Sequence, residues 1–219
     1  MLLWDNDGVL LDSERWYFQA SADILAERGV ELTEATFFQV SLVRGASVFE
    51  LLGPEVDRAT LGELRRRRNQ RFTEYLLRGG HLIPGVADVL AELAPCHRMA
   101  VVTGSQRHHF EAGHRDSGIL QHFEFIVTEE DAPRGKPHPD LYLAALARAG
   151  IGAADAVAIE DSPRGAQAAR AAGLRCLVVP RHGGDFPGAT AVLADVREIP
   201  GALGRLGRGE MCDGAGISP

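Results

Sequence analysis

The chain has 219 residues, of which 45% are hydrophobic and 24% are charged, and its formal net charge is -7 at pH 7. This length and composition are typical of a globular protein with one compact domain and a smaller inserted one. The negative net charge argues against a nucleic-acid partner, because such affinity comes mainly from Lys and Arg contacts to phosphates. No apolar run approaches the roughly 18 residues of a transmembrane helix, so we expect no membrane partner.

The first residues and the cysteines indicate a compartment. The opening MLLWDND contains two acids, unlike the basic and then apolar start of a secretory signal. The three cysteines are scattered without CxxC spacing, so the sequence indicates neither a disulfide framework nor a zinc knuckle. We therefore expect a cytoplasmic protein, with a monomer as the default oligomeric state.

Short apolar runs that end in polar loops are typical of buried parallel strands. They lie at 2–7, 99–105, 123–130, 156–162 and 176–180. Segments with helical spacing lie between them, at 85–94, 106–118, 138–149 and 163–172. This alternation predicts an α/β fold with a doubly wound, Rossmann-like parallel sheet.

The interval 14–80 breaks the alternation. Its helical patterns lie at 14–28, 33–41, 46–52 and 56–78, and it contains no convincing strand. We interpret 14–80 as an inserted all-helical cap domain, and 1–13 together with 81–219 as the α/β catalytic core. Asp12-Ser13 offers helix N-cap chemistry at one boundary, and Gly79-Gly80 offers a flexible return at the other.

Polar residues gather where the predicted sheet should bind a ligand. Open α/β sheets bind ligands beyond the carboxyl ends of their strands. Five polar residues directly follow predicted strands, and one lysine comes from the loop RGKPHPD. In chain order they are Asp5, Asp7, Thr103, Lys136, Glu160 and Asp161. We expect them to converge on one site.

Four ordered motifs, DNDGVLLDSE, VVTGS, GKPHPD and IEDSPRGAQAA, span the predicted core. They resemble the motifs of the haloacid dehalogenase-like hydrolase superfamily, in the same order and at compatible spacing. The inserted segment resembles the helical cap of the subgroup that holds beta-phosphoglucomutase and the sugar-phosphate and phosphoglycolate phosphatases. A lone DxDG is common by chance, whereas four motifs in order are rare.

Asp5 and Asp7 have the chemistry for two roles in phosphate ester hydrolysis. The Asp5 carboxylate can attack phosphorus and form an aspartyl-phosphate, which splits one difficult displacement into two easier ones. Asp7 can protonate the leaving alkoxide and later deprotonate the attacking water. We therefore predict a phosphoric monoester hydrolase that acts on a small phosphorylated metabolite.

The charge of the site predicts a divalent cation. The four acids would bring up to four negative charges beside a phosphate dianion, and each like-charged pair about 4 Å apart costs about 4 kcal/mol at an effective dielectric constant of about 20. Mg²⁺ prefers oxygen ligands and bridges carboxylates to phosphate. The resemblance implies a metal held by Asp5, Asp161 and the backbone carbonyl of Asp7, and leaves direct ligation by Glu160 open.

Lys136 is the only lysine among 23 basic residues. A compact ammonium fits between phosphoryl oxygens and a carboxylate better than a wider guanidinium does, which gives a reason for this lysine. Thr103, with the backbone amides of Gly104 and Ser105, offers hydrogen bonds to the transferring group. Arg44 lies where the resembling cap contacts substrate, and for it a substrate contact and a structural role are both open.

Other clusters in the sequence carry simpler interpretations. The run Arg65–Arg68 is expected to be a solvated face of a cap helix. The neighbouring histidines His108, His109, His114 and His122 are expected at the surface, because no acid pair completes a zinc site with them.

Related functions on the same scaffold fit the residues of this chain less well. A mutase of the beta-phosphoglucomutase type uses a cap histidine and a cap lysine, whereas Tyr17 occupies the corresponding position and 14–80 contains no lysine. A phosphonate hydrolase also needs a cap lysine, and a dehalogenase requires neither Asp7 nor a magnesium cluster. The mutase and a non-catalytic phosphate-binding module are kept as alternatives to the phosphatase. The sequence does not identify the phosphorylated substrate.

Overall fold

The computed structural model describes residues 1–207, so the end of the predicted core at 219 lies outside the described residues. The backbone contacts divide the chain into two units. The α/β unit contains Met1–Leu11, Leu82–Arg107 and the residues from Gly118 onward, and the helical unit contains Asp12–His81 and His108–Ser117. The predicted catalytic and metal-binding residues all lie in the α/β unit.

The α/β unit is built on a six-stranded sheet with the order β3-β2-β1-β4-β5-β6. The strands are β1 Leu2–Trp4, β2 Met99–Val102, β3 Phe125–Val127, β4 Val157–Glu160, β5 Arg175–Val178 and β6 Ala191–Val192. All neighbouring strands are parallel. The chain runs outward on one side of β1 through β2 and β3, and then on the other side through β4 to β6. This is the predicted doubly wound arrangement, and it makes β1 the central point at which the strand order reverses.

Each strand predicted from an apolar run is present, at a shorter length than the run itself. The first five strands are buried along nearly their whole length, as strands covered on both faces must be. Strand β6 was not predicted, because two residues at a sheet edge are too few for a periodic pattern.

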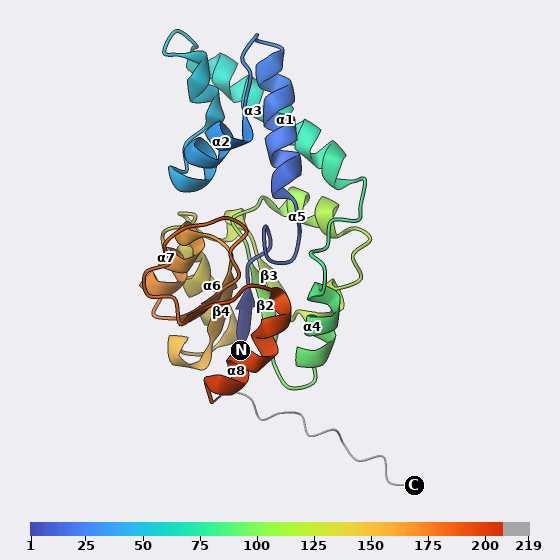
Figure 1. Ribbon diagram of the computed structural model, residues 1–219, viewed down its shortest axis with the longest axis vertical. Helices are drawn as coiled ribbons and strands as arrows, with labels where there is room; N and C mark the ends of the chain where they lie inside the picture. Colours follow the sequence, from blue (N-terminus) through green and yellow to red (C-terminus); the bar gives the residue numbers. More distant parts are fainter. Residues whose placement is uncertain (208–219) are drawn as a thin grey trace. The chain divides into compact units, whose positions relative to one another are not determined.

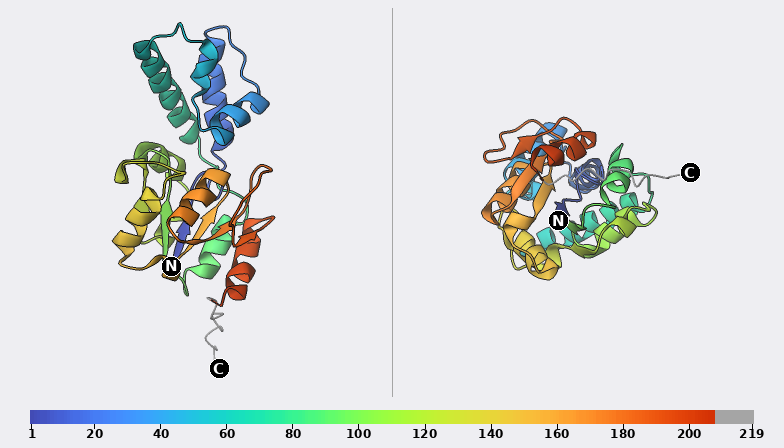
Figure 2. Two further views of the ribbon diagram at one scale, coloured as in Figure 1. Left: turned by 90° about the vertical axis from the view of Figure 1, so that its left-hand side faces the viewer. Right: turned by 90° about the horizontal axis from the view of Figure 1, so that it is seen from below.

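Helices cover both faces of the sheet (Figures 1 and 2). They are α4 Val86–Leu93, α6 Asp140–Ala149, α7 Pro163–Ala171 and α8 Ile199–Arg205. Helices α6 and α7 contact each other on one face, and α4 and α8 contact each other on the opposite face. The core beneath α6 and α7 includes the fully buried Leu3, Val102 and Tyr142. A buried side chain of this size contributes about 1.5–3 kcal/mol relative to an exposed one, so this core fixes the helices that carry site residues.

The start of α7 follows from its sequence. Ser162 is the N-cap residue, and its hydroxyl accepts a hydrogen bond from the Gly165 amide. Pro163 occupies the first helical position, where its missing amide proton has no cost. The chain therefore changes from strand β4 to helix α7 directly after Glu160 and Asp161, which holds both acids at the end of the sheet.

The helical unit contains α1 Glu14–Ala26, α2 Glu34–Phe37, a π-helix at Phe38–Val43, a 3-10 helix at Val48–Leu52 and α3 Arg58–Leu76. Helices α1 and α3 pack together, and the core beneath them includes Ile24, Phe37, Phe49 and Leu64. These elements confirm that the insertion is helical. The predicted helix at 33–41 is divided into one α-helical turn and the π-helical segment.

A boundary between the units along the chain falls within helix α5, Arg107–His114. Arg107 belongs to the α/β unit, and His108–Ser117 groups with the helical unit. The contacts of α5 explain this grouping, because the His109 ring lies 4.9 Å from the Phe72 ring and its Nε2 lies 3.3 Å from the Asn69 carbonyl oxygen. The expectation of surface histidines is wrong for His109 and His114, which are buried. For His109, packing of α5 against α3 decides this, and neither helix shows it in its own sequence.

The remaining regular elements are single turns of 3-10 helix. They lie at Leu120–His122, Glu129–Asp131, Ala153–Asp155 and Val196–Glu198. Within residues 1–207, none of the helices combines the length and the apolar character that crossing a bilayer would require.

Candidate active site

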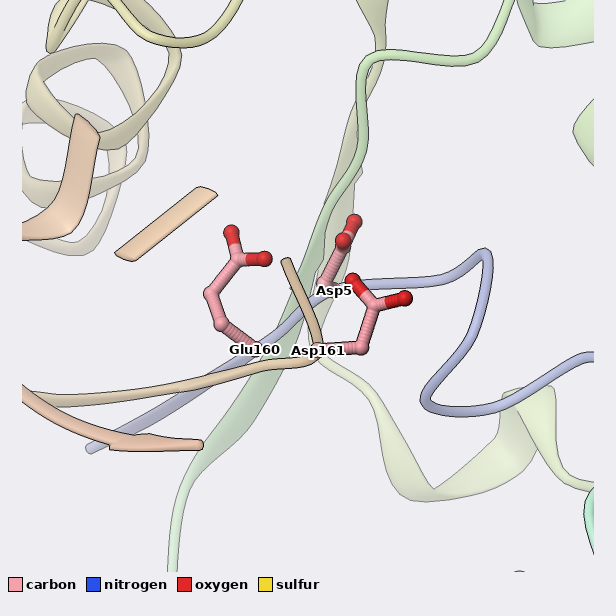
Figure 3. Close-up of side chains that lie close together, drawn as sticks. All are labelled: Asp5, Glu160 and Asp161. Atoms are coloured by element: carbon pink, nitrogen blue, oxygen red, sulfur yellow. The ribbon is translucent and has the colours of Figure 1, made fainter. Parts of the chain in front are cut away.

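The end of the sheet brings the predicted polar residues together. Strand β1 lies between β2 and β4, with Leu2 in register with both Met99 and Val157. The residues that follow these three strands therefore meet at their carboxyl ends. In the acid cluster, defined as Asp5, Glu160 and Asp161, each residue offers one carboxylate oxygen, and these three oxygens all lie within 4.8 Å of one another (Figure 3).

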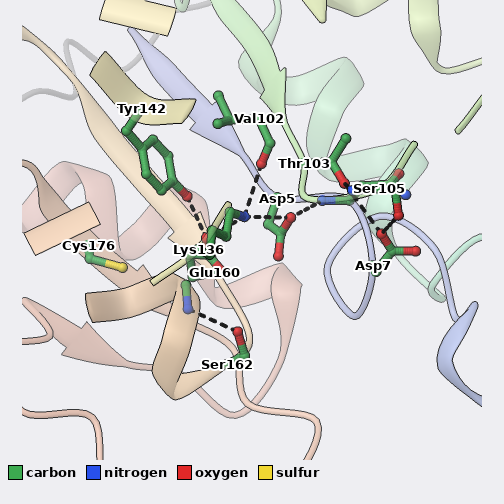
Figure 4. A network of polar contacts seen from close by, with 12 residues as sticks. Asp5, Asp7, Val102, Thr103, Ser105, Lys136, Tyr142, Glu160, Ser162 and Cys176 are labelled. Atoms are coloured by element: carbon green, nitrogen blue, oxygen red, sulfur yellow. Dashed lines mark hydrogen bonds and ion pairs between the residues drawn. The ribbon is translucent and has the colours of Figure 1, made fainter. Parts of the chain in front are cut away.

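Lys136 lies at the centre of the site (Figure 4). Its Nζ lies 2.8 Å from Oδ1 of Asp5 and 2.7 Å from Oε1 of Glu160. It also donates a hydrogen bond of 3.0 Å to the carbonyl oxygen of Val102, at the end of β2. Three acceptors thus surround one ammonium, which matches its three N–H donors.

The backbone around Lys136 is also held in place. The Arg164 guanidinium donates a 2.6 Å hydrogen bond to the Lys136 carbonyl oxygen. Arg164 belongs to the first turn of α7, directly beyond the acid cluster. The loop that carries the lysine and the helix that follows the acids are therefore tied to each other.

The charges of the site are out of balance, because the acid cluster has three carboxylates and the Lys136 ammonium pairs with two of them. Burial, together with the charge of Glu160, raises the pKa of Asp5 well above its ordinary value, although Lys136 acts in the opposite direction. Burial alone would lower the pKa of Lys136, but the charges of Asp5 and Glu160 outweigh it and raise the pKa. The pKa shift of Asp5 reflects burial first and the Glu160 charge second, and the shift of Lys136 reflects the two carboxylates beside it. One ammonium beside the three carboxylates of the acid cluster leaves an excess of negative charge. A further cation is the natural complement.

The donor set fits a hard divalent cation. All the ligands that the acid cluster offers are carboxylate oxygens, which Mg²⁺ prefers. Oε2 of the fully buried Glu160 has no hydrogen-bond partner among the described residues. A buried carboxylate oxygen without a partner is costly, and an ion close by removes that cost.

Two glycines allow the close packing of these acids. Gly8 has a φ of +84°, and a Cβ atom there would lie 1.8 Å from Oδ2 of Asp161. A Cβ atom on Gly165 would lie 1.8 Å from Oε2 of Glu160. Both glycines of the motifs therefore serve close approach to a carboxylate, and Gly8 also adopts a left-handed conformation that side chains disfavour.

Asp7 faces the residues that follow β2. The Ser105 hydroxyl donates to Oδ2 of Asp7 at 2.6 Å, and the Thr103 hydroxyl lies 3.4 Å from the same oxygen. The Ser105 amide in turn donates to the Thr103 hydroxyl oxygen at 2.9 Å. Thr103 is fully buried and Gly104 is exposed, so the turn 103–105 presents both hydroxyl and amide groups at this end of the sheet.

The structure adds residues that the motifs did not identify. The Tyr142 hydroxyl donates to Oε1 of Glu160 at 2.6 Å, and burial with the charge of Glu160 raises the pKa of this phenol. The backbone amide of Asn6 donates to Oδ1 of Asp5 at 2.7 Å, a contact that does not depend on the asparagine side chain. The only sequence signal for Tyr142 is its place on the buried face of the helix after Lys136.

Arg44 belongs to the helical unit and not to the unit that carries the acid cluster. Its side chain is exposed and lies 3.2 Å from Glu50. In the predicted arginine run, Arg66 pairs with Glu63 at 2.6 Å, as expected for a solvated face. Arg68 differs, because its guanidinium lies over the Tyr17 ring at 4.2 Å.

Comparison with known proteins agrees with this geometry. The family model of the haloacid dehalogenase-like hydrolases matches residues 2–179. The chain belongs to this family. As a haloacid dehalogenase-like hydrolase it has relatives with named activities, and these confirm the predicted enzyme class.

Three relatives of this haloacid dehalogenase-like hydrolase are informative. Protein CbbY of Rhodobacter capsulatus is 31% identical over 212 residues, which cover 89% of this chain and 92% of that protein. Hexitol phosphatase B of Escherichia coli K12 is 29% identical over 190 residues, which cover 81% and 82%. The solved structure of a CbbY mutant from Rhodobacter sphaeroides in complex with xylulose-(1,5)bisphosphate is 29% identical, with a TM-score of 0.76 over 89% of this chain and 93% of that one.

Proposed function

We propose that this protein is a Mg²⁺-dependent phosphatase that hydrolyses a small sugar phosphate through an aspartyl-phosphate on Asp5. The observation that carries the proposal is the Asp5 carboxylate, held by Lys136 within the acid cluster at the end of the sheet. The relatives support the substrate class, because one is named a hexitol phosphatase and another binds a pentulose bisphosphate.

In the proposed first step, Asp5 attacks phosphorus. Its Oδ1 accepts hydrogen bonds from Lys136 and from the Asn6 amide, so we assign Oδ2 as the attacking oxygen. As the new P–O bond forms, the ester P–O bond breaks and its electron pair goes to the leaving oxygen. Asp7 supplies the proton to that oxygen.

In the proposed second step, water cleaves the aspartyl-phosphate. Asp7, now ionised, takes a proton from the water as the water oxygen attacks phosphorus. The P–O bond to Asp5 breaks as the new bond forms, and phosphate is released. In this proposal the positive charge of Lys136 and hydrogen bonds from the turn at Thr103, Gly104 and Ser105 stabilise the phosphoryl oxygens. Mg²⁺ held by Asp5, Asp161 and the Asp7 carbonyl, with Glu160 beside them, would offset negative charge on these oxygens.

The cap assignment is part of the same proposal. We assign 14–80 as the cap and 1–13 with 81–219 as the catalytic core, with Arg44 as a cap residue that contacts substrate. A monomeric state stays a prediction.

The mutase alternative is weaker on residue type. Tyr17 stands where a mutase would use a histidine, and its ring packs 5.2 Å from Phe72 and 6.1 Å from Phe37. A phenol in such a setting is a poor substitute for an imidazole in proton transfer near neutral pH. A mutase would convert a hexose 1-phosphate only with the 1,6-bisphosphate present and would release no phosphate.

The test is phosphate release from a set of sugar phosphates and from an aryl phosphate. The wild type should release phosphate with Mg²⁺, and Asp5→Asn should abolish release because an amide is not a nucleophile here. The matched control Asp195→Asn, at an exposed carboxylate paired with Arg197, should keep full activity. Equal activity of Asp5→Asn and wild type would overturn the mechanism and point to another nucleophile. A wild type that releases no phosphate would instead favour the phosphate-binding module.

A further inference from the structure

The Ser105 hydroxyl makes a contact that the proposed chemistry does not yet use. Ser105 Oγ donates to Oδ2 of Asp7 at 2.6 Å, a short distance for a hydrogen bond between two oxygens. The Thr103 hydroxyl lies farther from the same oxygen, at 3.4 Å. Ser105 is therefore the stronger hydroxyl partner of Asp7.

The position of Ser105 is fixed from both sides of its backbone. Its amide donates to the Thr103 hydroxyl oxygen at 2.9 Å, and its carbonyl oxygen accepts a 3.1 Å hydrogen bond from the Glu129 amide. Thr103 is itself anchored, because its amide donates to the Val127 carbonyl oxygen at 2.9 Å. The Ser105 hydroxyl thus projects from a rigid turn between β2 and α5.

The Asp7 carboxyl group, by contrast, can rotate. Asp7 lies in the turn after β1, and rotation about the two bonds of its side chain sets the direction of the carboxyl group. Proton transfer requires the carboxyl oxygen to lie within hydrogen-bond reach of the atom that receives the proton. A fixed donor on one oxygen restricts the rotation of the whole group and so sets where the proton is delivered.

We propose that Ser105 is a positioning residue for Asp7, and that its hydroxyl orients the Asp7 carboxyl group for proton transfer to the leaving oxygen. This inference rests on the proposed phosphatase function. In the step concerned, the ester P–O bond breaks, its electron pair goes to the leaving oxygen, and the Asp7 proton moves to that oxygen. The role is distinct from the hydrogen bond that the Ser105 amide would offer to the phosphoryl group.

The proposal predicts a dependence on the leaving group. A 2,4-dinitrophenolate departs as a stable anion and needs no proton, whereas a phenolate is much more basic and benefits from one. Loss of the Ser105 hydroxyl should therefore slow cleavage of phenyl phosphate and have little effect on 2,4-dinitrophenyl phosphate. A hydroxyl that only binds the phosphoryl group, or only stabilises the fold, would affect both esters equally.

The experiment measures kcat/KM for both esters, because this quantity reports phosphoryl transfer to Asp5 whether or not the second step limits kcat. For Ser105→Ala we expect about a 10-fold to 100-fold loss with phenyl phosphate, no more than the lower end of the roughly 100-fold to 10,000-fold contribution of general acid catalysis, because Asp7 itself remains. With 2,4-dinitrophenyl phosphate we expect less than about a 3-fold loss. Ser105→Cys, with a weak donor of similar size, should show the same selectivity if Ser105→Ala folds poorly. Ser105→Thr, which keeps a hydroxyl, should restore activity toward phenyl phosphate.

Two controls complete the design. Ser117→Ala, a matched change in the helical unit where the hydroxyl lies 3.1 Å from His114 Nδ1, should leave the ratio of the two esters unchanged. In an Asp7→Asn background, Ser105→Ala should cause no further selective loss, because the acid that it positions is gone.

Equal losses for both esters, or a full additional loss in the Asp7→Asn background, would overturn the role of Ser105. Failure of the proposed function looks different, because the wild type would then cleave neither ester or Asp5→Asn would remain active.

Discussion

Gly165, in the first turn of helix α7, lies close against the Glu160 carboxylate. Only glycine fits at this position, because a Cβ atom there would lie 1.8 Å from Oε2 of Glu160. Glu160 has little room to move, because it is fully buried and its Oε1 is bound by both Lys136 and Tyr142. Gly165→Ala should therefore displace Glu160 and cost about 1–3 kcal/mol of stability, as overpacked cores do. Phosphate release should fall together with the melting temperature.

Gly62→Ala is the matched control for this change. Gly62 lies inside helix α3, and a Cβ atom there would meet nothing within 4 Å. Alanine in such a helix interior should stabilise the protein by about 0.5–1 kcal/mol. Thermal unfolding of the two variants should thus shift in opposite directions, and a stabilised Gly165→Ala variant would contradict the close contact with Glu160.

Lys136→Arg should reduce phosphate release strongly although it keeps the positive charge. The ammonium lies between Asp5, Glu160 and the Val102 carbonyl oxygen at 2.7 to 3.0 Å, and a planar guanidinium is too wide for this space. Displacement of reacting groups by about 1 Å can reduce the rate by about 100-fold, and we expect a loss of that order in kcat.

The control for this change is Arg98→Lys. It alters one basic side chain of the exposed pair of Arg98 and Glu124, and such surface pairs contribute about 1 kcal/mol or less to stability. This variant should leave the rate unchanged. A near-normal rate for Lys136→Arg would show that a lysine is not required at this position.

Mg²⁺ should stabilise the folded protein by binding to the acid cluster. At a free concentration 100 times its Kd, a ligand stabilises the folded state by about 2.7 kcal/mol. We expect a higher melting temperature in Mg²⁺ than in EDTA, and we expect Asp161→Asn to remove most of this shift. Asp195→Asn should retain it, and identical melting of the wild type in Mg²⁺ and EDTA would contradict the metal site.

Asp23 of the helical unit should contribute stability that depends on pH. Partial burial acts to raise the pKa of Asp23, but hydrogen bonds from Tyr75 and Gln19 and the Arg71 charge outweigh it, so its pKa lies below the ordinary value. Because the folded state favours the ionised form, this stability is present above the ordinary pKa of about 4 and is lost as the pH falls through the lower folded pKa.

Tyr75→Phe removes the hydrogen bond from the phenol to Asp23. The pKa of Asp23, followed by NMR titration of its carboxyl carbon, should rise toward the ordinary value. The stability difference between wild type and variant should be larger at neutral pH than in acid. An unchanged pKa would show that Tyr75 does not stabilise the ionised form.

The local patterns predicted much of the fold because each element carries its own signal. The apolar runs located the first five strands, and the polar residues after them marked the end of the sheet at which Asp5, Thr103 and Glu160 meet. Strand β6 and helix α8 were missed, because a two-residue strand and a seven-residue helix have too little periodicity.

The contacts within the site could not be predicted from local patterns in the sequence. Tyr142 reaches Glu160 from a helix 18 residues earlier in the chain, and α5 joins the helical unit through contacts to residues 40 positions away. Such pairings depend on how elements pack, and no spacing along the chain encodes them.

The sequence by itself determined which chemical groups are present and at which strand ends they occur, since alternating strands and helices force those ends to one edge of the sheet. Only the tertiary structure decided which donor meets which oxygen: Lys136 and Tyr142 on Oε1 of Glu160, and Ser105 on Oδ2 of Asp7. It also decided that Gly165 lies close against Oε2 of Glu160. The reason is physical, because a hydrogen bond depends on the distance and direction between two atoms. Side-chain rotation and helix packing fix those quantities only in the folded chain.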